Sequence, residues 1–156
     1  MSAEHDTLLS KLRGVVSRSV DRATALQQVA DLIRHDGGYR WVGLYEVDRA
    51  AEVVRNLVWS GIGPPEYTTF PVTKGLTGAA IAERRIVNVG DVSTDTRYLV
   101  ALSSTRSEII VPVFDRDGTS VLGTIDVESE RPNAFDAKAQ DLLLACSEVI
   151  RQLWQG

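Results

Sequence analysis

The 156-residue sequence is poor in the residues that usually carry redox and metal chemistry. It has one cysteine, Cys146, and two histidines, His5 and His35. One cysteine excludes an internal disulfide, and no group of His, Cys and carboxylate residues has the spacing typical of metal ligands. We therefore expect no metal site, no cofactor and no cysteine relay within a single chain.

The sequence also lacks a basic excess and long apolar runs. The formal net charge is -4, and no run of Lys and Arg is long enough to form a patch, so we do not expect nucleic acid as a partner. No apolar run approaches the roughly 20 residues of a membrane helix, and residues 1–14 lack the apolar core of a secretory signal. We expect a cytoplasmic protein that makes no membrane contact.

What the sequence does contain is typical of a globular α+β domain. Its hydrophobic share of 44% and charged share of 24% are ordinary, and its length predicts one domain over 1–156. Apolar residues at helical spacing predict two helices within 1–36 and one over 136–155. The β-rich runs between them predict a sheet and a pocket over 40–128.

Two segments of the middle region are expected to form the pocket. Residues 76–85 contain good helix formers and predict a short helix, whereas 90–107 is rich in Ser, Thr and Asp and predicts a long loop without regular structure. An antiparallel sheet of about five to six strands needs cover on one face, and the terminal helices can supply it. The short helix and the long loop would then cap a pocket on the other face.

The hairpin predicted over 107–129 carries two acidic residues on its apolar side. Strand alternation points Glu108 and Asp126 the same way as Ile110. Buried carboxylates without partners are costly, so some group must meet them. Nearby loop amides or an arginine such as Arg97 or Arg106 could meet them, and a ligand with a positive end, most simply an amino group, is the other alternative.

Four segments, in this order and spacing, resemble a GAF domain, which has a PAS-like α+β sensor fold. The segments are RWVGLYEV, KGLTGAAIAERRIVNVGDV, SEIIVPV followed by VLGTIDVES, and FDAKAQDLLLACSEVI. The resemblance covers nearly the whole chain. It implies a sensory domain that binds a small molecule.

Within that family the sequence is most similar to the free methionine-R-sulfoxide reductases. The positions that match their motifs are Trp41, Gly43, Tyr45, Ser107, Glu108, Ile109 and Asp126, and Glu128 stands where a second carboxylate would be. The resemblance implies that Glu108, Asp126 and Glu128 hold the positive end of a ligand.

Three aromatic residues are further candidates for the ligand site. Trp41 and Tyr45 share a strand parity and could enclose an apolar or cationic part of the ligand, although each could equally be a core aromatic. Tyr98 in the long loop is a candidate lid residue or a surface anchor.

The sequence differs from the reductases at the positions of their cysteines. Where the family has cysteines, this sequence has Thr77 in GLTG, Ala101 by its spacing to Ser107, and a residue near Tyr67. The reductase mechanism needs one thiolate to attack the sulfoxide and a second thiol to resolve the product. Cys146 lies in an apolar helical stripe and is expected to be a buried hydrophobe. We therefore expect a non-catalytic sensor, with a reductase-like enzyme and a scaffold with an empty pocket as the alternatives.

The terminal helices predict a protein partner. The last one ends in Ile150, Leu153 and Trp154, and the helices together offer more apolar surface than one sheet face can cover. A homodimer through these helices would bury the excess, and a monomer with docked helices is the alternative. The sequence shows no kinase, cyclase or DNA-binding segment, so we expect a separate downstream signalling protein.

Overall fold

The computed structural model describes residues 3–18, 20–100 and 102–154 as an antiparallel sheet between two unlike layers. The sheet has the order β3-β2-β1-β6-β5-β4. Its strands are β1 (Trp41–Asp48), β2 (Val53–Gly61), β3 (Thr69–Pro71), β4 (Val87–Val89), β5 (Ser107–Phe114) and β6 (Val121–Ser129). The helices are α1 (Ala3–Ser17), α2 (Arg22–Gly37), α3 (Gly75–Glu83) and α4 (Ala137–Ile150), with short 3-10 turns η1 (Val92–Thr94) and η2 (Arg151–Leu153).

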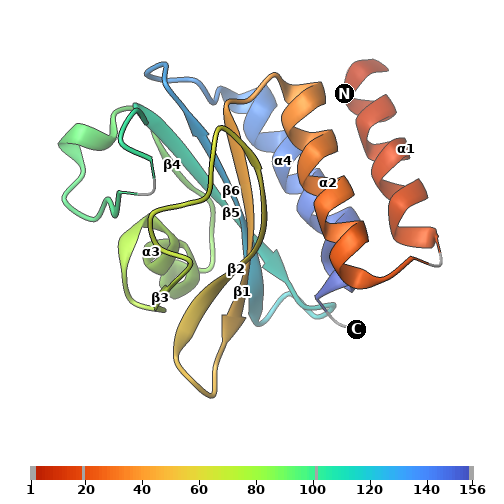
Figure 1. Cartoon of the computed structure of the whole chain (residues 1–156), viewed down its shortest axis with the longest axis horizontal. Helices are drawn as coiled ribbons and strands as arrows, with labels where there is room; N and C mark the ends of the chain where they lie inside the picture. Colours follow the sequence, from red (N-terminus) through yellow and green to blue (C-terminus); the bar gives the residue numbers. More distant parts are fainter. Residues whose placement is uncertain (1–2, 19, 101, 155–156) are drawn as a thin grey trace.

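The terminal helices cover one face of the sheet (Figure 1). α2 packs on β1 and β2, α4 packs on β5 and β6, and α1 lies against α2 and α4. Side chains from these elements form one large apolar core, whose fully buried members include Leu12, Val29, Ile33, Val127 and Leu143. This arrangement confirms the predicted α+β fold with its helical layer.

Capping residues define the helix boundaries that periodicity alone left approximate. The Asp21 side chain accepts a hydrogen bond from the backbone N–H of Thr24, as expected for an N-cap, and Gly38 adopts a left-handed conformation (φ 67°) that ends α2. α4 ends at Ile150 and continues as η2, so the regular helix is shorter than the predicted 136–155. Residue 155 itself lies outside the described part of the chain.

α3 and the long loop lie on the other face of the sheet, opposite the helical layer (Figure 1). α3 packs on β5, β4 and β6. The loop between β4 and β5 is not wholly irregular, because the Asp91 side chain accepts from the Ser93 backbone N–H and begins the turn η1. The prediction of a loop without any regular structure was therefore wrong at this point.

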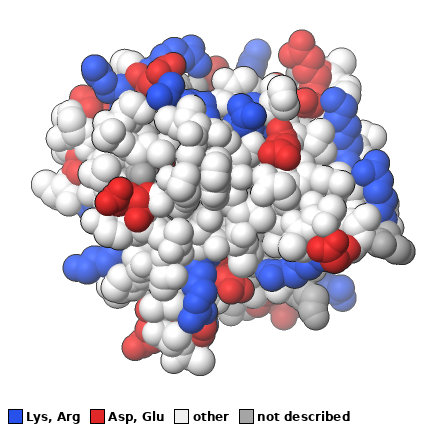
Figure 2. Space-filling model, viewed as in Figure 1, with Lys and Arg blue, Asp and Glu red and all other residues white. Residues whose placement is uncertain are grey.

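The molecular surface carries both signs of charge. On the face shown in Figure 2, Lys and Arg side chains alternate with Asp and Glu side chains, without a large area of one sign. Within the described residues, no helix is long and apolar enough to cross a membrane.

A buried carboxylate cluster as candidate functional site

The pairing of β5 with β6 brings three acidic residues together. Glu108 lies opposite Glu128, and Ile110 lies opposite Asp126. Because side chains alternate along a strand, all four point to the same face, which confirms the alternation predicted for Glu108 and Asp126. One carboxylate oxygen from each of the three acids lies within 4.8 Å of the others. We call these three residues the carboxylate cluster.

The carboxylate cluster is buried and incompletely satisfied. Glu108 and Asp126 are each 4% exposed and Glu128 is 0% exposed. The Thr105 hydroxyl donates a 2.6 Å hydrogen bond to Glu128 Oε1, but Asp126 Oδ1 and Glu128 Oε2 have no partner among the described residues. Unpaired oxygens of this kind are costly in a protein interior and suggest a missing positive group.

Arginine does not fill that role in the described part of the chain. Arg97 pairs with Asp95 at 2.7 Å, and no ion pair there involves the carboxylate cluster. The side chain of Arg106 is exposed and forms no ion pair with the cluster. The alternative in which Arg97 or Arg106 neutralises the acids therefore does not match this structure.

Burial shifts the ionisation of all three acids. It is the main cause that raises the pKa of Glu108, and the negative charges of Asp126 and Glu128 raise that pKa further. The pKa of Asp126 rises to about 6 through burial, although a hydrogen bond from the Glu108 carboxyl partly opposes the shift. Burial also raises the pKa of Glu128. Without a positive guest, the cluster therefore retains protons that free carboxyl groups would have lost.

A small cavity opens directly beside the carboxylate cluster. Its volume is about 20 Å³, enough for about one water molecule. Its lining residues come from β1, β3, β5, β6, α3 and loops beside them: Tyr45, Tyr67, Phe70, Gly75, Leu76, Thr77, Leu99, Val100, Glu108 and Asp126. A larger ligand could enter only if the segment carrying Leu99 and Val100 moved.

The loop forms its side of this cavity through close contact with α3. Gly75 begins α3 at φ 71°, and a Cβ built there would lie 3.0 Å from Leu99 Cβ. Glycine thus allows both the backbone conformation and the approach of the loop. No local sequence pattern marks Phe70, Leu76 or Leu99 as lining residues, and Gly75, the first glycine of GLTG, is the one signal of close approach.

The three aromatic candidates are placed differently relative to the cavity. Tyr45 lines it, is 2% exposed, and has a raised pKa caused by burial and by the three nearby acids. Trp41 does not line it; this side chain is fully buried and its indole N–H donates to the Gly63 carbonyl at 2.8 Å. Its ring lies over Gly43, where any side chain would overlap it. The WVGLY pattern therefore stacks Trp41 beside Tyr45 across a glycine.

Tyr98 lies near the carboxylate cluster but outside the cavity lining. It packs against the apolar group formed by Leu76, Ala80 and Ile110, and its hydroxyl donates weakly to the Leu102 carbonyl at 3.4 Å. Burial raises its pKa, with further contributions from Glu128 and Glu108. The side chain thus ties the long loop to the sheet close to the acids.

Two of the positions where the reductase resemblance implies cysteines reach the cavity. Thr77 and Tyr67 both line it, and Ala101 lies outside the described residues. Cys146 is on α4 in the opposite layer, is fully buried, and has a pKa raised to about 12 by burial. The thiol of Cys146 is therefore neutral at physiological pH and separated from the cavity by the sheet.

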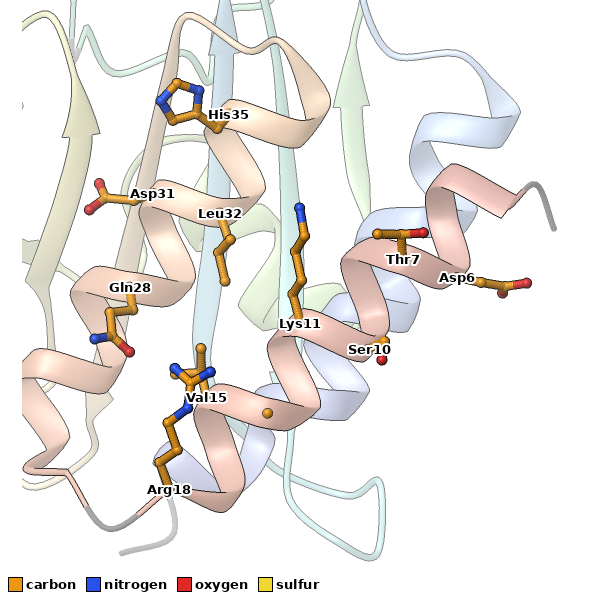
Figure 3. Close-up of a pocket in the computed structure, with 11 residues that line it drawn as sticks. Asp6, Thr7, Ser10, Lys11, Val15, Arg18, Gln28, Asp31, Leu32 and His35 are labelled. Atoms are coloured by element: carbon orange, nitrogen blue, oxygen red, sulfur yellow. The ribbon is translucent and has the colours of Figure 1, made fainter.

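A second hollow, between α1 and α2, has a different character. This groove of about 720 Å³ is lined by charged side chains, including Lys11 from α1, Arg18 just after it and Asp31 from α2, together with the aliphatic Val15 and Leu32 (Figure 3). It lies on the helical layer, away from the carboxylate cluster (Figures 1 and 3).

Residues 21–153 match the GAF domain family. The chain belongs to this family. The GAF fold is shown equally by solved structures, including the GAF domain of an Acinetobacter phosphoenolpyruvate-protein phosphotransferase, with a TM-score of 0.87 at 19% identity over 99% of this chain and 95% of that one.

Relatives of this GAF domain include free methionine-R-sulfoxide reductases. The Neisseria meningitidis reductase, solved in complex with its substrate, superimposes with a TM-score of 0.87 at 28% identity, over 97% of this chain and 88% of that one. The Saccharomyces cerevisiae reductase is 25% identical over 94% of this chain and 83% of its own length. GAF domain-containing protein A of Dictyostelium discoideum is 26% identical over 85% of this chain and 81% of its own length.

Proposed function

We propose that this GAF domain is a non-catalytic sensor that binds a small polar ligand with a cationic group, such as an amino acid derivative. The observation that carries the proposal is the carboxylate cluster, with two oxygens that lack partners and no basic side chain paired to it in the described part of the chain. An ammonium group would supply hydrogen-bond donors and positive charge together. We expect it to be held by Glu108, Asp126 and Glu128.

The aromatic residues would shape the rest of this ligand site. Tyr45 lines the cavity and would flank the ligand, Trp41 would support Tyr45 from behind Gly43, and Tyr98 would hold the loop closed. Since the closed cavity holds about one water molecule, ligand entry requires the loop to open. If ligand binding orders the loop between β4 and β5, a downstream signalling protein could recognise the ordered loop.

Ligand titration tests this proposal. Calorimetry and thermal-shift measurements with free amino acids, methionine sulfoxide and nucleotides should show a rise in the melting temperature with at least one amine. Glu108→Gln should weaken that binding, whereas Glu148→Gln, which removes an exposed carboxylate on α4, should not. Equal behaviour of the wild type and Glu108→Gln across the whole panel would contradict a ligand role.

A reductase is the second candidate, because the Neisseria and yeast relatives have that activity in their names. It predicts consumption of free methionine-R-sulfoxide with dithiothreitol as reductant, abolished in Cys146→Ser. The burial of Cys146 on the far side of the sheet argues against it. An inactive wild type would end this candidate.

A scaffold with an empty pocket is the third candidate. It requires a pocket without room for a ligand and acids that are neutralised by arginines, and the structure matches only the first requirement. The cavity is small, as that reading expects, but the acids are not neutralised by arginines among the described residues. We therefore rank it behind ligand binding.

A cytoplasmic homodimer through the terminal helices remains a prediction. Ile150 is already fully buried within the chain, and Leu153 and Trp154 are partly buried. Trp154 also donates to the Tyr45 carbonyl at 2.9 Å, so these residues are engaged without a partner. Light scattering across a range of protein concentrations would give the oligomeric state.

A further inference from the structure

The carboxylate cluster suits a guest much smaller than an organic ligand. The adjoining cavity of about 20 Å³ accepts one water-sized body while the loop stays closed. Charge nevertheless calls for a cation, since the three acids have no Lys or Arg ion pair in the described part of the chain. A metal ion is both small and positive.

The spacing of the oxygens fits a single metal ion. One carboxylate oxygen from each of Glu108, Asp126 and Glu128 lies within 4.8 Å of the other two. Oxygen ligands lie about 2.3–2.6 Å from Ca²⁺, so ligands on opposite sides of one ion are separated by about 4.6–5.2 Å. The three oxygens can therefore share one coordination sphere. Carboxylates are ligands preferred by Ca²⁺, Mn²⁺ and Mg²⁺.

The unpartnered buried oxygens distinguish the carboxylate cluster from a merely acidic surface. Asp126 Oδ1 and Glu128 Oε2 are buried with no hydrogen-bond partner among the described residues, so each has a lone pair available. The Thr105 hydroxyl holds the other oxygen of Glu128 at 2.6 Å. Outer hydrogen bonds of this kind orient a ligating carboxylate.

We propose that Glu108, Asp126 and Glu128 bind one divalent metal ion that prefers oxygen ligands, such as Ca²⁺ or Mn²⁺, when no organic ligand is present. Since an ammonium group and the ion need the same oxygens, the two compete.

The test uses the full chain, freed of metal with a chelator and then titrated with CaCl₂ or MnCl₂ alone. Calorimetry should show one ion per chain, and the melting temperature should rise with ion concentration. Glu128→Gln should weaken binding by at least about 10- to 100-fold, the range seen when only an outer partner of a ligand is lost. Glu148→Gln, which removes an equal charge from the surface, should bind as the wild type does.

The proposal is overturned if neither ion binds at millimolar concentration, or if Glu128→Gln binds as tightly as the wild type. Circular dichroism verifies folding, and Asp126→Asn replaces Glu128→Gln if the latter does not fold. The inference uses the same carboxylates as the proposed function but does not depend on it. Metal binding without a response to any amine would support the metal site and contradict the proposed function. Amine binding without metal binding would support the proposed function and contradict the metal site.

Discussion

The two faces of one hairpin show how the same strands build two unlike environments. On the helical side, β5 and β6 contribute Ile109, Val111, Ile125 and Val127, all fully buried against α2 and α4 or their neighbours. On the other side they contribute Glu108, Asp126 and Glu128, which are equally buried. Burial is thus the same on both faces, and only the polarity differs. The helical side is a fully packed apolar core, whereas the other side has buried carboxylate oxygens without hydrogen-bond partners among the described residues.

The largest expected effect comes from placing a charge on the helical side. Val127→Asp puts a carboxylate next to Asp126 in sequence but on the apolar face, where no cavity or partner is available. An unpaired buried charge costs about 3–5 kcal/mol, a large share of the stability of an ordinary domain, so the urea midpoint of the variant should fall sharply at 25 °C. Urea unfolding followed by circular dichroism measures this.

Val127→Ala is the control for lost packing at the same site and should retain a cooperative transition. If Val127→Asp were as stable as Val127→Ala, the contrast between the two faces would be wrong.

A smaller effect of the opposite sign is expected on the ligand side. The pKa of Asp126 is raised to about 6 in the folded chain, against about 3.9 when unfolded. The folded state then binds more protons between these values, so the free energy of unfolding falls as pH rises through this window, and the raised pKa of Glu108 and Glu128 extends the fall upward. Stability is therefore expected to be higher at pH 4.5 than at pH 7.5.

Asp126→Asn measures how much the Asp126 carboxyl alone contributes to this pH dependence of stability. At pH 7.5 and without added metal or amine, this variant should be more stable than the wild type by about 1–3 kcal/mol, and its stability should depend less on pH. Urea midpoints from pH 4.5 to 8 provide the comparison. A loss of stability in Asp126→Asn at neutral pH would mean that the carboxylate is already well paired.

The smallest effect concerns the boundary of the helical layer. Asp21 caps α2 by accepting from the Thr24 backbone N–H at 3.1 Å, and this hydrogen bond, with one from the Thr24 hydroxyl, lowers its pKa. Asp21→Ala should cost about 1 kcal/mol, and Asp21→Asn should restore most of it. An unchanged urea midpoint in Asp21→Ala would show that tertiary packing alone defines the start of α2.

Local patterns allowed prediction of much of this fold. Helical spacing located the three long helices, and strand alternation placed Glu108 and Asp126 on one face. The short strand β3 was expected only as an extended piece of loop, because its three residues become a strand through pairing with β2. Such pairing depends on contacts distant in sequence.

The candidate site was predictable in its residue types but not in its shape. The three acids lie on β5 and β6, and alternation gives the face of each, but their closeness follows from the register that sets Glu108 opposite Glu128. Trp41 and Tyr45 share a face as expected, yet only Tyr45 lines the cavity. The contact of Leu99 with the start of α3, which closes the cavity, has no local signal beyond one glycine.

The order and periodicity of side chains alone determined the secondary structure, the α+β class and the presence of acids on an apolar strand face, because these follow from interactions between near neighbours along the chain. The strand register and the packing of the long loop on α3 decided how close those acids lie, which oxygens lack partners and how much room a guest has. These depend on distances between segments far apart in sequence, which only the folded chain specifies.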